Sequence, residues 1–181
     1  ISVVPAAGTT FAAEDNIIYG NTLMYGATSG EVYINGRVGE RFAVRNSGAT
    51  AVIEGAGDHC CEYMTGGVVG VLGTVGRNFG AGMSAGVAYI YDEEHNFDYF
   101  CNMEMVELTL VEDLYDMKEL RALVERHYAE TSSAKAKRIL DNWNEAVNNF
   151  IKVTPIEYKK VLMEKRLREL EAKQKHVTLH E

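Results

Sequence analysis

A repeat of 19 residues is the feature that most restricts how this chain can fold. The segments 30–48, 49–67 and 68–86 align with one another without gaps. Two aligned columns hold mostly apolar residues and a third holds glycine: Ile34, Ile53, Leu72 and Tyr91; Tyr33, Val52, Val71 and Ile90; and Gly48, Gly67 and Gly86. A period of this length is too short for a repeat of paired helices and suits one coil of a β-solenoid.

The period therefore predicts a mainly β fold, a parallel β-helix or solenoid with about 19 residues in each coil. Strands of successive coils would stack about 4.8 Å apart, so that the side chains of one column lie on each other. Glycine suits the corners between strands because it adopts positive φ angles and allows close backbone approach without steric cost. The end coils would expose unpaired backbone groups, so we expect the second half of the chain to cap one end.

The distribution of glycine divides the chain in two, because all 17 glycines lie between Gly8 and Gly86. The glycine-rich part has short β-branched or aromatic runs, whereas the part after it has apolar residues at helical spacing. We expect residues 1–110 to form the β-helix. Residues 111–181 are expected to form C-terminal α-helices that pack on the β-helix or extend beyond it.

Helix starts can be read in the second part of the chain. Asp116 and Glu119 form a capping-box pattern, and Ser133 can cap a helix over residues 134–151. Pro155 suits the first position of a last helix. An apolar stripe predicts the core-facing side of the middle helix: Ile139, Leu140, Trp143, Val147 and Phe150. The charged stretch 164–175 is expected to extend into solvent or against a partner.

Composition excludes several classes of protein. The net charge of −8 leaves no electrostatic footprint for nucleic acid, and no apolar run is long enough to cross a membrane. The N-terminus has no pattern of a signal peptide, and its start at Ile1 favours a fragment of a longer chain. Three cysteines form neither a disulfide framework nor a paired metal knuckle. These observations predict a soluble protein of the cytoplasm.

The polar motifs of the glycine-rich part have structural interpretations that we favour over catalytic ones. The clusters at 55–59 and 80–86 precede no helix, as a dinucleotide site would require, so we interpret them as corners. His59, Cys60 and Cys61 would point to opposite faces of a strand, which is unsuited to proton transfer between neighbours. The sequence therefore predicts no catalytic, cofactor-binding or metal-binding residue.

The remaining candidates also favour structural roles. Turn and surface positions suit the three carboxylates Glu54, Asp58 and Glu62, and core packing suits the two methionines Met64 and Met83. Trp143 is interpreted as a packing residue and His127 as a surface histidine, and residues 135–138 form too short a basic cluster to indicate nucleic acid. Pairing with nearby carboxylates is favoured, and contact with an acidic partner is the alternative, for the four front-half arginines: Arg37, Arg41, Arg45 and Arg77.

Long motifs of the chain resemble a known family. The runs NIIYGNTLMYGATSGE (16–31), GERFAVRNSGATAVIEGAGDHCCEYMTGG (39–67), VLGTVGRNFGAGMSAGVAYIYD (71–92) and SAKAKRILDNW (133–143) closely resemble the C-terminal, GXGXG-type domain of the glutamate synthase large subunit. The likeness runs from about residue 16 to about residue 162. The chain departs from the family pattern at Cys60 and Ala85, where that pattern usually has glycine.

The resemblance implies a right-handed β-helix with a non-catalytic role. In this family an amidotransferase domain releases ammonia from glutamine, and a domain with FMN and an iron–sulfur cluster adds it to 2-oxoglutarate. The β-helix domain is the scaffold that holds both for ammonia channelling. The resemblance therefore implies no cofactor in this chain, and it implies the amidotransferase and FMN-binding domains or subunits as partners.

Two other interpretations stay open at this point. One is a stand-alone solenoid enzyme with a cleft that uses Asp58, His59 and Cys61. The other is a homo-oligomerisation module that self-associates through its open first coil. The electron donor of the parent enzyme, and the choice between fragment and separate subunit, are not fixed by these residues.

Overall fold

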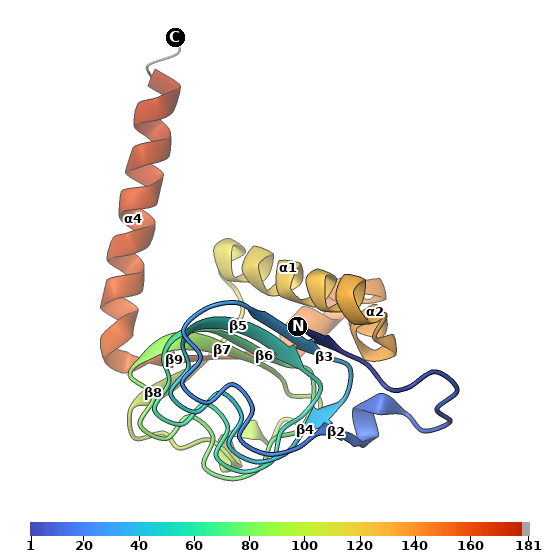
Figure 1. Ribbon diagram of the computed structural model, residues 1–181. Coiled ribbons are helices and arrows are strands. Elements are labelled where there is room, and N and C mark those ends of the chain that lie inside the picture. Colours follow the sequence, from blue (N-terminus) through green and yellow to red (C-terminus); the bar gives the residue numbers. More distant parts are fainter. Residues whose placement is uncertain (179–181) are drawn as a thin grey trace.

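The computed structural model describes the backbone of residues 1–178 and the side chains of residues 1–172, and it is a stack of parallel β coils with helices after it (Figure 1). Seven strands form one sheet in the order β1-β3-β5-β6-β7-β9-β8, and β2 and β4 form a second. Pairing is parallel from β1 through β7 and antiparallel where β9 meets β7 and β8. The predicted parallel solenoid is confirmed.

The strands are β1 (Ser2–Val3), β2 (Ile17–Tyr19), β3 (Glu31–Ile34), β4 (Arg37–Val38), β5 (Ser47–Ile53), β6 (Thr65–Val71), β7 (Ala85–Tyr91), β8 (Val106–Leu110) and β9 (Phe150–Pro155). The α-helices are α1 (Leu114–Thr131), α2 (Ala134–Asp141), α3 (Trp143–Ala146) and α4 (Ile156–Thr178). Short 3₁₀ helices lie at Ala13–Asp15, Phe97–Tyr99 and Val147–Asn149. Because β9 belongs to the sheet, the sheet contains residues from both sides of position 110, the expected boundary between the β-helix and the helical part.

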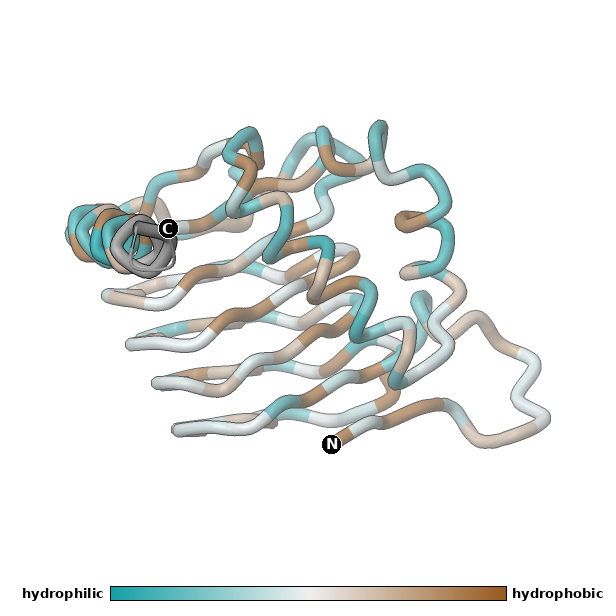
Figure 2. The backbone as a smooth tube through the Cα atoms, turned by 90° about the horizontal axis from the view of Figure 1, so that it is seen from above, coloured by the Kyte–Doolittle hydropathy of each residue, from teal (hydrophilic) through white to brown (hydrophobic). Residues whose placement is uncertain are grey.

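The strand register follows the repeat, with one slip between β5 and β6 and another between Thr65 and Val68 where β6 meets β7. Val32 pairs with Ala51, nineteen positions further on, and Val69 pairs with Ala88 at the same spacing. Between β5 and β6 the register shifts between Ser47 and Thr50, so that Ala51 pairs with Val69 at a spacing of eighteen. A bulge of this kind changes the residue count of one coil without breaking the sheet. Figure 2 shows the resulting rungs stacked one behind another.

The slip between β5 and β6 moves both predicted apolar columns, so that Ile53 pairs with Val71 rather than with Leu72. Val52 pairs with Gly70 rather than with Val71, and Val71 instead lies beside Ile53. The true inward columns are Val32, Ala51, Val69 and Ala88, and Ile34, Ile53, Val71 and Ile90, all of which belong to the core inside the coils. Alternate strand residues such as Tyr33 and Tyr89 belong to a second core beneath the helices. Both faces of the sheet are therefore apolar.

The turns opposite the sheet have an unexpected backbone. Residues of positive φ recur at every second position in successive coils: Arg41, Ala43 and Arg45; and His59, Cys61 and Tyr63. The expectation that glycine alone would supply these angles is wrong. A left-handed residue costs about 1–2 kcal/mol, but the conformation aims alternate peptide groups along the stack. The Arg41 N–H donates to the Asp58 carbonyl at 2.9 Å, and the Ala43 N–H donates to the Leu23 carbonyl at 3.0 Å.

The helical part departs from its expected layout. Helix α1 is capped by Asp113, whose side chain accepts from the N–H groups of Tyr115 and Asp116, so the predicted cap at Asp116 is wrong. Ser133 caps α2 as predicted, accepting from the Ala136 N–H at 3.0 Å. The single helix expected over 134–151 is instead two α-helices, one 3₁₀ turn and the start of β9.

Strand β9 forms because an open sheet edge outweighs local helix propensity. Phe150 pairs with Tyr91 of β7, and the next three residues each have a partner in both β7 and β8. This pairing satisfies the free edge of the last coil, which would otherwise expose unpaired backbone groups. Phe150 itself is fully buried, so its predicted core-facing role is confirmed although it lies in a strand.

The helices cover the sheet face rather than the end of the stack. Helices α1 and α2 lie across the outer face of β3, β5 and β6, whereas residues 92–105 cover the last coil (Figure 1). There, Phe97 packs edge-on against Phe79 with ring centroids 5.2 Å apart. The second half of the chain caps this end as expected, but through residues 92–105 and β9 rather than through α1 and α2. Helix α4 begins at Ile156, one residue after Pro155, and extends away from the coils (Figure 1).

Candidate functional site

The polar residues of the turns at 58–62 do not form a catalytic cluster. Asp58 accepts from the Arg77 N–H at 2.8 Å and pairs with the Arg77 guanidinium at 3.3 Å. The Arg77 backbone N–H, above all, lowers the pKa of Asp58. His59 instead contacts Glu62, with 2.7 Å between Nδ1 and Oε1. Each polar side chain thus has its own neighbour, while Cys61 is fully buried.

The adjacent cysteines both point into the core. Their sulfur atoms are 3.8 Å apart, and the prediction that Cys60 and Cys61 face opposite sides is wrong. The reason is the left-handed conformation of Cys61, which is not that of a strand residue. Burial raises the pKa of Cys60 well above its usual value and raises the pKa of Cys101 to about 12. These thiols are therefore protonated at neutral pH.

An iron–sulfur cluster does not fit these cysteines. Such clusters are held mostly by four thiolates, and this chain has three cysteines, two of them with raised pKa. Within the described residues, no group of three or more histidine, cysteine, aspartate or glutamate side chains has the geometry of a metal site.

We expect the cysteines to be nearly inert in the folded protein. With an excess of iodoacetamide at pH 8, less than one thiol per chain should be alkylated within minutes, because a protonated, buried thiol is a poor nucleophile. After unfolding in guanidinium chloride all three should react. Mass spectrometry of the modified peptides measures both states. Rapid modification of Cys60 in the folded protein would contradict the burial described above.

Alkaline pH should destabilise the fold. Burial raises the pKa values of Cys60, Cys101 and Tyr89, and the hydroxyl of Tyr89 donates to Glu119 Oε2 at 2.5 Å. The folded chain keeps these protons at a pH where the unfolded chain loses them, so stability is complete below about pH 8.5 and falls above it. Urea unfolding at pH 7.5 and 9.5 tests this. The loss of stability between these two pH values should be smaller in Cys60→Ala than in the unchanged protein. Equal midpoints at both pH values would refute the prediction.

The other sequence candidates have mixed outcomes. Met64 and Met83 are fully buried, which confirms their role in the core. Of the four front-half arginines, Arg77 pairs internally as favoured. Within the described part of the chain, Arg37, Arg41 and Arg45 form no ion pair, so the favoured interpretation holds for Arg77 alone among the four.

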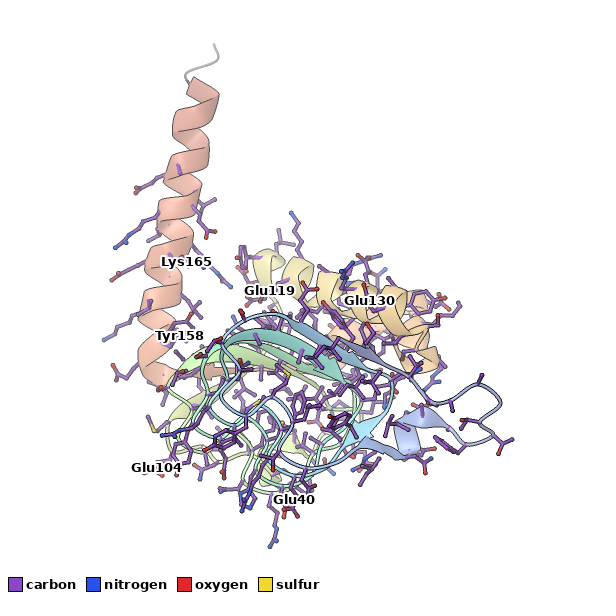
Figure 3. All side chains as sticks on the ribbon, in the orientation of Figure 1. Glu40, Glu104, Glu119, Glu130, Tyr158 and Lys165 are labelled. Carbon is purple, nitrogen blue, oxygen red and sulfur yellow. The ribbon has the colours of Figure 1, made fainter. Side chains whose placement is uncertain are left out.

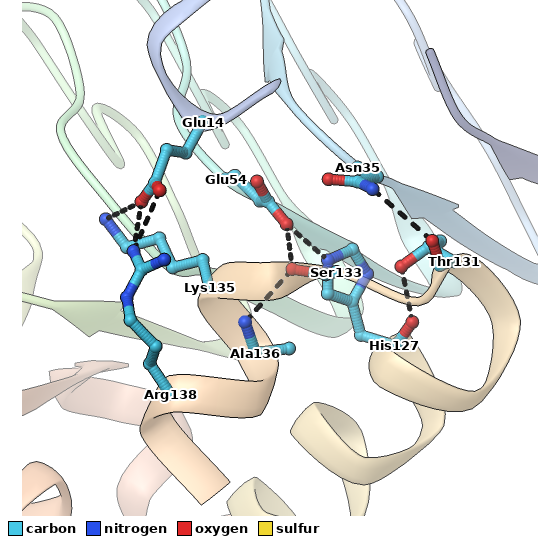
Figure 4. Close-up of polar contacts among 9 residues, drawn as sticks. All are labelled: Glu14, Asn35, Glu54, His127, Thr131, Ser133, Lys135, Ala136 and Arg138. Carbon is cyan, nitrogen blue, oxygen red and sulfur yellow. Dashed lines mark hydrogen bonds and ion pairs between the residues drawn. The ribbon is translucent and has the colours of Figure 1, made fainter. Parts of the chain in front are cut away.

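A buried polar contact joins the sheet to the helices (Figure 4). Glu54, at the end of β5, receives a short hydrogen bond from the Ser133 hydroxyl, and its Oε1 atom lies 3.1 Å from His127 Nε2. His127 on α1 is fully buried and Glu54 is buried too, so the surface positions predicted for both residues are wrong. The carboxylate lies between the histidine and the serine, whereas a catalytic triad needs histidine between the other two.

The protonation of this contact follows from its neighbours. Glu54 Oε1 accepts hydrogen bonds, so His127 carries its proton on Nε2. Among the described residues, His127 Nδ1 has no hydrogen-bond partner. Ser133 donates to Glu54 and also accepts from the Ala136 N–H. One carboxylate therefore fixes α1, the start of α2 and the coil, which makes this contact a structural latch.

Charged pairs extend the latch at the surface. Arg138 of α2 donates twice to Glu14, at 2.6 and 2.8 Å, and thereby holds the N-terminal segment (Figure 4). Lys135 lies 3.4 Å from Glu93 and reaches a cavity of about 230 Å³ that Glu54 also lines. This cavity is lined by residues of the coils, of the N-terminal segment and of α2, and its paired charges include Glu14, Glu93 and Lys135.

A second buried pair anchors the last helix. Lys152 of β9 donates to Asp116 Oδ2 at 2.8 Å, and Arg166 of α4 contacts the other oxygen of the same carboxylate. Arg166 also lies over the ring of Tyr115, 4.4 Å from its centroid. The first half of α4 is thereby fixed to α1 and to the sheet, and Figure 3 labels Tyr158 near its start and Lys165 one residue before Arg166.

The stacked coils, the helix-covered sheet and the latch at Glu54 define a parallel β-solenoid domain whose described polar groups mainly hold its own parts together. The GXGXG motif family model matches residues 1–156. The chain belongs to this family, and the resemblance to the GXGXG-type domain of glutamate synthase is confirmed.

Curated relatives are glutamate synthases. The chain is 53% identical to the NADPH glutamate synthase large chain of Bacillus subtilis, over 90% of this chain and 11% of that protein. It is 52% identical to ferredoxin-dependent glutamate synthase 2 of Synechocystis, over 86% of this chain and 10% of that protein. Identity to the NADH glutamate synthase of Schizosaccharomyces pombe is 49%, over 94% of this chain and 8% of that protein. The chain thus spans about a tenth of each relative.

Proposed function

We propose that this chain is the non-catalytic scaffold domain of a glutamate synthase, which holds the amidotransferase and FMN-binding domains in place for ammonia channelling. One observation carries the proposal. The three relatives are named for three electron donors, NADPH, ferredoxin and NADH, yet their matching segments are all about half identical to this chain. A segment that handled the donor would be expected to differ with it.

The geometry supports a scaffold in a second way. Buried polar contacts of the described residues connect one element of this fold to another, as Glu54 does for the coil, α1 and α2. Coil-to-coil hydrogen bonds make such a stack stiff, which suits a part that fixes distances between other domains. On this proposal the FMN and the iron–sulfur cluster belong to other parts of the parent enzyme. We further propose that the parent enzyme is cytoplasmic. No helix among the described residues is long and apolar enough to cross a membrane.

A segment exchange tests the proposal. The matching segment of the Bacillus subtilis large chain is replaced by this chain, and glutamine-dependent glutamate formation is measured with NADPH and with ferredoxin. We expect the chimaera to keep NADPH as its donor and to retain activity within about tenfold of the parent, a factor that corresponds to about 1.4 kcal/mol. A donor preference that moves with the segment would contradict the proposal.

The catalytic alternative has its own test. Asp58→Asn and His59→Gln are introduced together into the full-length parent enzyme, because these side chains are the accessible members of the proposed cleft. A scaffold role predicts that kcat for glutamine hydrolysis and for ammonia-dependent glutamate formation changes less than twofold. A loss of a hundredfold or more with normal folding would indicate catalysis, because removal of an acid–base group typically costs 10²–10⁴.

Self-association stays a prediction. The first coil exposes apolar side chains that could contact another copy: Phe11, Ile17, Tyr19 and Tyr25. Light scattering of the chain at high concentration measures this directly, and a dimer is the result expected from that interpretation.

A further inference from the structure

A basic and aromatic groove lies on the turns opposite α1. It has a volume of about 390 Å³ and is lined by Tyr25, Arg41, Arg45, His59, Glu62 and Tyr63. Figure 3 shows Glu40, beside the groove in sequence, on the far side of the coils from Glu119 and Glu130 of α1. The groove is therefore remote from the helices and from the latch at Glu54.

The left-handed turns create the groove. Arg41 and Arg45 have positive φ and are exposed, while Ala43 between them is fully buried. The alternation therefore sends both guanidinium groups outward from one coil. The next coil repeats the pattern, with His59 and Tyr63 on either side of a buried cysteine. Two adjacent coils thus contribute a pair of arginines and a neighbouring aromatic residue.

Tyr63 is positioned by a glycine of the following coil. A Cβ atom at Gly82 would lie 2.4 Å from Cδ1 of the Tyr63 ring, so the absence of a side chain there makes room for the ring. Tyr63 nevertheless remains 56% exposed, and Tyr25 is 54% exposed. Exposed aromatic rings held in place by the backbone lose little conformational freedom when a partner covers them.

The charges of the groove are unbalanced. Glu62 is already engaged, since its Oε1 atom lies 2.7 Å from His59 Nδ1 and 2.9 Å from Asn78 Nδ2. Arg41 and Arg45 make no side-chain hydrogen bond or ion pair with the described residues of this chain. Two unpaired guanidinium groups so close together are notable in a chain of net charge −8. Guanidinium groups bind carboxylates in bidentate fashion, so the groove is complementary to an acidic partner.

We propose that this groove docks a carboxylate-bearing segment of another domain of the parent glutamate synthase, and this inference rests on the function proposed above. A protein partner is favoured over a small anion because tyrosine and arginine are the residues enriched at the centres of protein interfaces. The open groove has no deep enclosed site for a small ligand. This chain matches only 8–11% of its relatives, whose remaining length includes the other domains that could supply the segment.

Zero-length cross-linking tests the docking. Arg41→Lys and Arg45→Lys are made singly in the full-length enzyme, which places an amine in the groove, and a carbodiimide then joins amines to carboxylates in contact. We expect a cross-link within one molecule to an aspartate or glutamate outside these 181 residues. The proposal is overturned by no cross-link, by one confined to these residues, or by one to a second copy.

Charge reversal provides an independent measurement. In the full-length enzyme, Arg41→Glu combined with Arg45→Glu should speed hydrogen exchange at least tenfold in residues 58–64, because the docked segment would leave. Lys137→Glu on α2 is the matched control, since it reverses an exposed charge away from the groove. Unchanged exchange in the double variant, with circular dichroism that confirms its fold, overturns the docking. The scaffold proposal is tested by a different experiment, the segment exchange, and it fails if the donor preference follows the exchanged segment.

Discussion

Glu54→Ala is expected to lower the free energy of unfolding by about 3–5 kcal/mol, because it leaves two buried partners without their acceptor. His127 and Ser133 are both fully buried, and Glu54 is the hydrogen-bond acceptor they share. For a chain of this size the expected decrease in Tm is roughly 6–20 °C. Thermal unfolding followed by circular dichroism measures the change.

Two variants calibrate this result. Glu54→Gln keeps an oxygen that can accept from Ser133 and His127, so the loss should be about 1–2 kcal/mol. Glu125→Ala removes an exposed carboxylate that pairs with Arg121, and its effect should stay below about 0.5 kcal/mol. If Glu54→Ala were as mild as Glu125→Ala, the latch would not hold the helices to the coils.

Gly67→Ala is expected to cost about 3 kcal/mol or more. Gly67 has a φ angle of +82°, and an added Cβ would lie 2.3 Å from the carbonyl oxygen of Ala49 in the preceding coil. The strained angle and the clash with backbone act together, because neither coil can move without losing its hydrogen bonds to the other. Urea unfolding should show a lower midpoint with a similar slope.

The same strand offers a matched control. At Gly70 an added Cβ would lie 3.4 Å from the Val52 side chain, and the φ angle is not in the left-handed region. Gly70→Ala should therefore change the free energy of unfolding by less than about 1 kcal/mol. Equal destabilisation by Gly67→Ala and Gly70→Ala would contradict the coil-to-coil contact described here.

The repeating part of the fold was predictable because each coil places similar side chains in similar surroundings. Column residues such as Ile34 and Ile53 mark the inward face, and the period fixes how far apart their strands lie. The bulge between Ser47 and Thr50 was not predictable, because a slip of one residue leaves apolar residues at neighbouring positions of the strand. Local sequence therefore determines the stack but not every register.

The parts that the sequence did not reveal depend on contacts distant along the chain. Strand β9 forms because β7 offers it an edge, although its residues follow a helical apolar pattern. His127 is buried because Glu54, in a coil far away in sequence, meets it beneath α1. The left-handed turns were not predicted because many of their positive-φ residues are not glycine. Hydrogen bonds between coils stabilise these turns.

The candidate sites likewise divide into those that the repeat predicted and those that depend on the three-dimensional fold. The structural roles of Met64 and Met83 were predictable from their repeat positions, because both point inward. The exposure of Arg41 and Arg45 required the three-dimensional turn, although their place among few basic residues had suggested an acidic partner as one alternative. A signal that could have found the groove is the spacing of two arginines four positions apart, with the small residue Ala43 midway between them.

On the function proposed above, this domain holds two catalytic domains so that ammonia passes between them. Free ammonia released per glutamine consumed, measured in the full-length enzyme that carries Gly67→Ala or Gly70→Ala, tests it most directly. The account predicts that Gly67→Ala releases ammonia to solution while glutamine hydrolysis and ammonia-dependent glutamate formation continue, and that Gly70→Ala does not. Tight coupling in Gly67→Ala, with hydrogen exchange showing that its coils have loosened, would contradict the account.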